Sequence, residues 1–141
     1  MNDNLTELVF ILDMSGSMSP LTDDTIGGYN SLLKKQKDQH GDANITTVLF
    51  DDRYMMLHDG ESIENVKNLT NKEYVPWGTT AMLDAVGKTI AHIDHKMKCI
   101  PEEKRAGKVF VTIMTDGMEN ASREYSWESV QSMIKEKKRK I

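Results

Sequence analysis

A short polar stretch near the start of the chain carries groups that could bind a metal ion. Asp13, Ser15 and Ser17 stand at alternate positions directly after the apolar run 8–12. They can direct one carboxylate and two hydroxyl groups to a common point, and such hard oxygen donors suit Mg²⁺, Mn²⁺ or Ca²⁺. Gly16 allows a tight turn between the two serines. Taken alone, the stretch slightly favours an ordinary turn, because Asp, Ser and Gly are common turn residues.

Two later stretches carry similar donors, and each also lies at a junction between expected elements. Thr79 and Thr80 open a segment with helical apolar spacing, and Asp116 and Gly117 follow the strand-like run 108–114. A metal site needs donors that converge from separate loops, and the loops at the carboxyl ends of parallel strands supply that arrangement. The three stretches together therefore predict a divalent-metal site.

The order of these motifs, Asp-x-Ser-x-Ser, then Gly-Thr-Thr-Ala-Met-Leu-Asp-Ala, then Thr-Asp-Gly, resembles the von Willebrand factor type A (VWA) domain. The resemblance runs from about Leu5 to the end of the chain, and in that family these segments form the metal-ion-dependent adhesion site (MIDAS). It implies five metal ligands, which are Asp13, Ser15, Ser17, Thr80 and Asp116. Thr79 stands where many relatives have glycine, so either threonine could face the metal.

Further residues are expected behind the ligands or on the rim of the site. Glu119 is a candidate for orienting bound water or backbone, since a carboxylate beside a metal loop can do this. Flexible methionine side chains suit adaptable protein-binding surfaces, so Met18 and Met118 are expected to be exposed there. Trp77 either packs beneath the loop or lies exposed beside the metal. The full set is Gly16, Met18, Trp77, Thr79, Gly117, Met118 and Glu119.

The elements that position these residues alternate between strands and helices. The continuous apolar run 8–12 suits a central strand of a parallel sheet, with both faces covered. Helical spacing follows it up to about Lys37, and the strand-like runs 45–50 and 54–57 are so close that they must pair antiparallel. The expected fold is α/β, a doubly wound and mostly parallel sheet with one antiparallel edge strand. Asp51 and Asp52, at the tip of this hairpin, are expected to form a solvated turn.

Length and composition limit the possible functions. At 141 residues the chain is expected to be a single domain over 1–141, and its net charge of −4 gives no electrostatic footprint for nucleic acid. The N-terminus lacks a secretory signal, no apolar run reaches membrane-spanning length, and a single cysteine, Cys99, agrees with a reducing compartment. We expect a cytoplasmic protein with neither a nucleic-acid nor a membrane partner.

Family members usually continue with further strands, so we expect the C-terminal strands to be missing here and the domain to be truncated. An exposed sheet edge would then invite a homodimer.

The resemblance implies a protein-binding adaptor of the bacterial or phage cytosolic type. Its metal, Mg²⁺ or alternatively Mn²⁺ or Ca²⁺, leaves one coordination position open for an Asp or Glu side chain of a partner protein. The alternative is a metal-dependent phosphatase or hydrolase that uses the same cation as a Lewis acid. Such an enzyme needs a general base or nucleophile near the metal, and none of the three loops contains a histidine, so binding is favoured over catalysis. A degenerate, purely structural domain is the third possibility, and the five suitable ligand residues argue against it.

Overall fold

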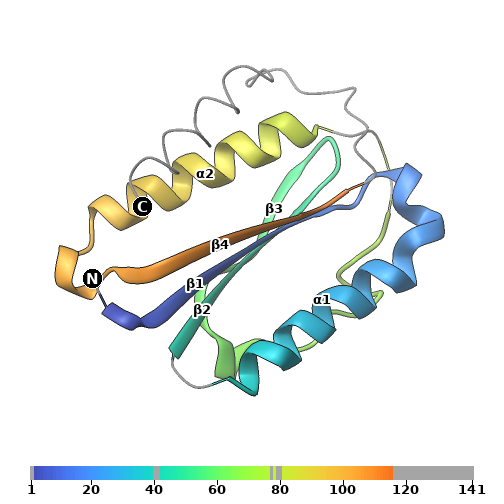
Figure 1. Cartoon of the computed structure of the whole chain (residues 1–141). Helices are drawn as coiled ribbons and strands as arrows, with labels where there is room; N and C mark the ends of the chain where they lie inside the picture. Colours follow the sequence, from blue (N-terminus) through green and yellow to red (C-terminus); the bar gives the residue numbers. More distant parts are fainter. Residues whose placement is uncertain (1, 40–41, 77, 79–80, 116–141) are drawn as a thin grey trace.

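Four strands form one sheet at the centre of the molecule. The computed structural model of the 141-residue chain describes residues 2–39, 42–76, 78 and 81–115. The strands are β1 (Asn2–Asp13), β2 (Asp42–Phe50), β3 (Tyr54–Ser62) and β4 (Ala106–Met114), in the spatial order β3-β2-β1-β4. β1 pairs in parallel with β2 and β4, and β2 pairs antiparallel with β3 (Figure 1). The predicted mostly parallel sheet with one antiparallel edge strand is confirmed.

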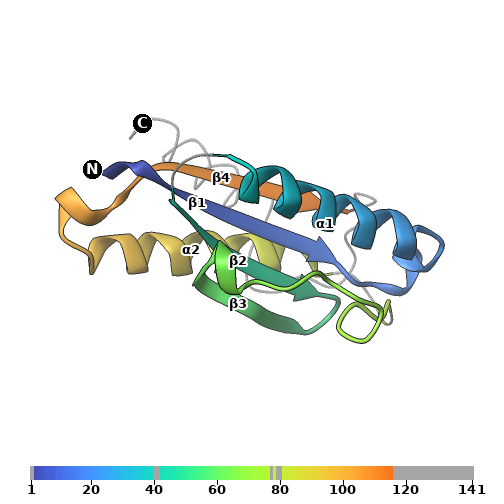
Figure 2. The ribbon, with the colours of Figure 1, turned by 90° about the horizontal axis from the view of Figure 1, so that it is seen from below.

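One long helix covers each face of this sheet (Figure 2). α1 (Thr22–Lys37) and α2 (Met82–Lys98) lie on opposite sides of β1. Since side chains alternate along a strand, neighbouring residues of β1 enter different cores. Phe10 and Leu12 pack in the cluster that includes α1, whereas Val9 and Ile11 pack in the cluster that includes α2. This is why the run 8–12 is apolar without interruption.

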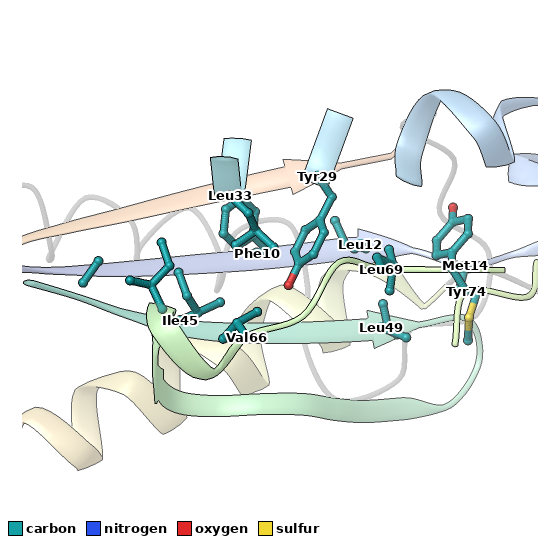
Figure 3. Packing of buried hydrophobic residues seen from close by; sticks show 12 residues of the cluster. Phe10, Leu12, Met14, Tyr29, Leu33, Ile45, Leu49, Val66, Leu69 and Tyr74 are labelled. Carbon is teal, nitrogen blue, oxygen red and sulfur yellow. The ribbon is translucent and has the colours of Figure 1, made fainter. Parts of the chain in front are cut away.

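The larger core lies between α1 and the sheet, and an aromatic pair stands at its centre (Figure 3). The rings of Phe10 and Tyr29 meet edge to face with their centroids 5.0 Å apart. The Tyr29 hydroxyl lies 2.8 Å from the hydroxyl of Thr47, so the buried phenol keeps a hydrogen bond. Met14 and Tyr74 lie at the end of this core where β1 and β2 terminate, directly beneath the candidate site.

Short helical turns connect the main elements. A 3₁₀ helix, η1 (Gly16–Leu21), joins β1 to α1. Two shorter ones are η2 (Ile63–Asn65), which follows β3, and η3 (Glu102–Lys104), which lies between α2 and β4. Helical spacing of Ile63, Val66 and Leu69 predicts one or two helical turns, but only the first residue lies in a turn. Val66 is extended and both it and Leu69 are buried against the α1 core, because an extended segment reaches further across that core than a helix would.

β4 differs from the other parallel strands because its apolar side chains stay partly exposed. Val109, Phe110, Val111 and Ile113 have exposed fractions between 36% and 54%. In the described part of the chain, β4 has a neighbouring strand only on its β1 side. None of the helices in this part is sufficiently long and apolar to cross a lipid bilayer.

Candidate metal centre

The first predicted metal loop forms a closely spaced cluster of side-chain oxygens at the end of β1. Asp13 is fully buried, and its Oδ1 accepts hydrogen bonds from the backbone N–H of Ser15 at 2.9 Å and from the Ser15 hydroxyl at 2.6 Å. The Ser15 Oγ lies 3.1 Å from the Ser17 Oγ. Ser15 is buried whereas Gly16 and Ser17 are exposed, so the cluster is closed behind Asp13 and reaches solvent at Ser17.

Two further hydroxyl groups fix Asp13 from other parts of the fold. Thr115, directly after β4, donates from its Oγ1 to the Asp13 Oδ2 at 2.7 Å. The hydroxyl of the buried Tyr74 donates to the backbone carbonyl of Asp13. A group that follows β4 therefore orients the Asp13 carboxylate, and a group that follows β3 holds the Asp13 backbone.

Local chemistry explains why the loop folds in this way. A carboxylate that accepts the N–H two residues ahead forms an Asx turn, and this turn lets the chain leave the sheet immediately after Asp13. The N–H of Met18 then bonds to the Ser15 carbonyl at 3.0 Å and starts the 3₁₀ helix η1. The two serine hydroxyls consequently lie on the same side as the Asp13 carboxylate.

The donor set fits a small divalent cation. Oxygens at neighbouring positions around an octahedral Mg²⁺ are roughly 2.9 Å apart, given Mg–O distances of about 2.1 Å. The separations from Asp13 Oδ1 to Ser15 Oγ and from there to Ser17 Oγ, 2.6 and 3.1 Å, bracket this value. Within the described residues, all side-chain partners of Asp13 are uncharged hydroxyls. A buried carboxylate without a positive neighbour is costly, and a bound cation would offset that cost.

The other predicted site residues fall partly outside the described residues. Thr79, Thr80, Trp77 and Asp116, with Gly117, Met118 and Glu119, belong to this group. Among the described residues, no three His, Cys, Asp or Glu side chains gather in a way that could hold a metal. Hydroxyl groups, which these four residue types lack, make up most of the oxygen donors of the first loop. The fold brings the oxygens of Asp13, Ser15 and Ser17 together, and the whole predicted ligand set stays a prediction.

The predicted exposure of Met18 at the rim is wrong. Its exposed fraction is 2%, and that of Met14 is also 2%. The turn of η1 directs the apolar thioether of Met18 away from water, as the hydrophobic effect favours. Met14 packs in the α1 core, where its sulfur accepts the N–H of Val75 at 3.2 Å.

The prediction that Asp51 forms part of a solvated turn is also wrong. It has no exposed surface, although its neighbour Asp52 is exposed. Arg53 holds the Asp51 carboxylate through Nη2 at 2.8 Å, Nε at 3.2 Å and its backbone N–H at 2.7 Å. Burial raises the pKa of the Asp51 carboxyl, but the hydrogen bonds and charge of Arg53 outweigh this effect and bring the pKa below its usual value.

Comparison with known proteins gives matches at the level of structure. No family model matches the sequence, and no curated protein matches it. Proximal thread matrix protein 1 from the mussel byssus is similar at a TM-score of 0.57 and 20% identity, over 97% of this chain and 35% of that one. The same mussel protein with a zinc-occupied MIDAS motif matches at a TM-score of 0.56 and 18% identity, over the same shares of the two chains.

A bacterial structure is also similar. An aerotolerance-related membrane protein from Bacteroides fragilis matches at a TM-score of 0.52 and 17% identity, over 93% of this chain and 63% of that one. These likenesses support a VWA fold for the chain. The chain spans only about a third of the length of the mussel protein, 35%.

Proposed function

We propose that the chain is a divalent-cation-dependent protein-binding module of the adaptor kind. In this proposal the loop after β1 holds a cation, and an Asp or Glu side chain of a partner protein binds to it. The supporting observation is the cluster of Asp13, Ser15 and Ser17 oxygens, which is buried on one side and open to solvent on the other. Likeness to a protein whose MIDAS motif holds zinc supports a divalent cation, and Mg²⁺, Mn²⁺ or Ca²⁺ would suit oxygen donors.

The charges of the loop favour binding of an anionic partner group. Asp13 supplies the single formal charge of the described donors, while the Ser15 and Ser17 hydroxyls are neutral. A bound divalent cation would therefore keep much of its positive charge and offer a position to an outside carboxylate. The exposed Ser17 lies where such a group can approach.

We infer that the module is not an enzyme. His58 lies on β3, where it pairs with Thr47, and His92 and His95 lie in the second half of α2, so none of these three histidines belongs to the loops at the carboxyl ends of β1 and β2. General acid or base catalysis at the metal would need such a group close to the Asp13 cluster. A cytoplasmic location is part of the same proposal, and the free cysteine Cys99 agrees with it.

Calorimetric titration of the metal-stripped protein with Mg²⁺ and Mn²⁺ tests the site. We expect saturable binding that Asp13→Asn abolishes. Asp59→Asn, which removes the same charge from the exposed part of β3, serves as the matched control and should bind as the unmodified chain does. Absence of binding in the unmodified chain, or equal binding by Asp13→Asn, would contradict the proposal.

Partner binding is tested by capture in Mg²⁺ and in EDTA. A specific partner should be retained only with Mg²⁺ and only by a chain with Asp13. Replacing single acidic residues of that partner by their amides should identify the one that binds the cation. Retention that is unchanged in EDTA would contradict a metal-mediated contact.

Association of two copies through β4 is a further part of the proposal. Its support is the exposed apolar surface of Phe110 and Val111 at the edge of the described sheet. Sedimentation analysis should show a dimer that Val111→Lys disrupts. A monomer at high protein concentration would contradict this association.

A further inference from the structure

The turn between β2 and β3 lies directly against the candidate metal centre. Asp13 at the end of β1 pairs with Phe50 at the end of β2, and the N–H of Met14 donates to the Phe50 carbonyl at 2.6 Å. Asp51 is the next residue after this contact. The turn and the first metal loop therefore begin side by side at the same edge of the sheet (Figure 1).

Arg53 makes this turn rigid. Its side chain and backbone N–H together give the Asp51 carboxylate three hydrogen bonds, and the Asp51 N–H bonds to the Arg53 carbonyl at 3.1 Å. A planar guanidinium that contacts both carboxylate oxygens fixes orientation as well as distance. The carboxylate has no exposed surface, whereas the Arg53 side chain is 55% exposed.

The fixed turn holds the segment that precedes α2 at two points. The Asp51 carbonyl accepts the N–H of Ala81 at 2.9 Å. At the other point, Gly78 has a φ of +81° and packs so closely that a Cβ there would lie 3.3 Å from Asp52 Oδ1 and 3.7 Å from Asp51 Oδ2. Glycine tolerates this backbone conformation and this approach better than other residues.

Gly78 in turn contacts the metal loop. Its carbonyl accepts the N–H of Gly16 at 3.0 Å, and Gly16 lies between the two serines whose hydroxyls face Asp13. A continuous series of contacts thus runs from Arg53 through Asp51 and Gly78 to the peptide that joins Ser15 to Ser17. Loss of the first contact would loosen the last one.

We propose that Asp51 and Arg53 are positioning residues of the metal centre, which act on Gly16 through Gly78 and do not bind the metal. This proposal rests on the proposed function, because it assumes that the first loop holds a divalent cation. Groups that orient ligands typically change metal affinity by 10- to 100-fold when they are removed. Asp51 would belong to that class although it lies outside the metal-binding motif.

The test compares affinities for Mg²⁺ and Mn²⁺, measured by calorimetry on the metal-stripped chain and its variants. Asp51→Asn should weaken binding by roughly 10-fold or more, because the amide cannot hold both nitrogens of Arg53. Arg53→Lys keeps the charge but loses the planar fork, so it should weaken binding to an intermediate degree. Asp59→Asn is the matched control, since it removes an equal charge from an exposed side chain of β3 that takes no part in these contacts, and it should change affinity by less than about 3-fold.

Folding must be separated from positioning. Circular dichroism and urea unfolding in EDTA report the folded fraction of each variant, and affinities are compared per folded molecule. A folded Asp51→Asn variant with unmodified affinity, or an equal loss in Asp59→Asn, would overturn the proposal. If Asp51→Asn fails to fold, the affinity of Arg53→Lys tests the proposal instead. Unmodified affinity in Arg53→Lys would then overturn the proposal. An unmodified chain that binds neither cation would instead refute the proposed function, and this inference with it.

Discussion

The central strand β1 buries two carboxylates, Asp13 at its carboxyl end and Glu7 in its first half, and the fold treats them differently. Asp13 is surrounded by hydroxyl and amide donors and has no positive neighbour among the described residues. Glu7 has an exposed fraction of 7% and faces α2, where Lys96 supplies a positive charge. Lys96 offsets part of the cost of burying ionised Glu7, whereas the described residues leave Asp13 with a charge that a bound cation could balance.

The surroundings of Glu7 form a polar cluster of Glu7, Thr46, Asp59, His92 and Lys96, which we call the Glu7 cluster. Thr46 Oγ1 donates to Glu7 at 3.4 Å, and Asp59 Oδ1 lies 3.1 Å from Lys96 Nζ and 2.9 Å from His92 Nε2. The number of acidic residues does not distinguish the two regions. The charge balance around each carboxylate separates the two regions.

The largest expected difference between the regions is the response of stability to metal. At a Mg²⁺ concentration about 100 times the dissociation constant, binding should raise the free energy of unfolding of the unmodified chain by about 2.7 kcal/mol. Asp13→Asn should lose this increase entirely, whereas Glu7→Gln should keep it. Urea unfolding with Mg²⁺ and with EDTA measures both. An increase that survives in Asp13→Asn would place the cation elsewhere.

Removal of Lys96 should give the next largest change in the free energy of unfolding, and this change should arise in the Glu7 cluster. Lys96→Met leaves Glu7 without its positive neighbour, so stability at pH 7 should fall by roughly 1–2 kcal/mol. Near pH 4 the loss should be smaller, since Glu7 then takes up a proton. Lys98→Met is the control, because Lys98 pairs with Asp94 on the helix surface and should cost less than about 0.5 kcal/mol. Equal losses in the two variants would show that Lys96 does not neutralise Glu7.

Much of the region at the carboxyl ends of β1 and β2 could be predicted from the sequence, because the residues that determine its structure are close together in the chain. The apolar run 8–12 and the polar residues after it lie within ten residues, and the run identifies a strand with two covered faces. The hairpin of β2 and β3 followed from its short connection, which permits only antiparallel pairing. Side chains close in sequence determine both features, so no knowledge of distant contacts was needed.

The features that the sequence did not reveal depend on distant parts of the chain. Asp51 is buried because Gly78 and Ala81 pack on its turn, some 30 residues further along. Nothing close to Glu7 in the sequence marks it as part of a buried cluster, since its neighbours come from β2 and α2. The exposure of Met18 was misjudged because a methionine next to a functional loop can turn either toward solvent or toward the core.

Neutralising Glu7 itself should stabilise the protein at neutral pH. Burial raises the pKa of the Glu7 carboxyl, and the charge of Lys96 offsets this effect only in part. The folded state therefore favours the protonated form, and stability present at low pH is lost as the pH rises through the folded pKa. Glu7→Gln avoids this loss, so it should be more stable than the unmodified chain at pH 7, by something on the order of 1 kcal/mol.

Urea unfolding from pH 4 to pH 8 measures this difference. The gain from Glu7→Gln should grow as the pH rises and disappear toward pH 4. A variant that is less stable than the unmodified chain at pH 7 would mean that Lys96 overcompensates the burial of Glu7. In that case the Glu7 cluster would hold a stabilising ion pair.

Asp59 should show the smallest effect and the opposite dependence on pH. Burial raises the pKa of its carboxyl, but the hydrogen bonds and charges of His92 and Lys96 outweigh this and lower it. The stabilisation is then present above the usual pKa of about 3.9 and is lost as the pH falls through the folded pKa. The Asp59 side chain is 46% exposed, so Asp59→Asn should cost only about 0.5 kcal/mol at pH 7 and nothing near pH 2.

The difference between Asp59→Asn and the unmodified chain should also shrink in 0.5 M NaCl, because salt screens exposed charges. Unfolding curves at the two salt concentrations measure this change. If Asp59→Asn and Glu7→Gln shifted stability in the same direction at pH 7, the charge of Lys96 would not act on the two carboxylates in the way their pKa shifts indicate. Opposite shifts would mean that Lys96 stabilises the ionised form of the exposed Asp59, whereas the buried Glu7 still favours its protonated form. The depth of burial would then decide whether each carboxyl group stabilises the fold in its charged or its neutral form.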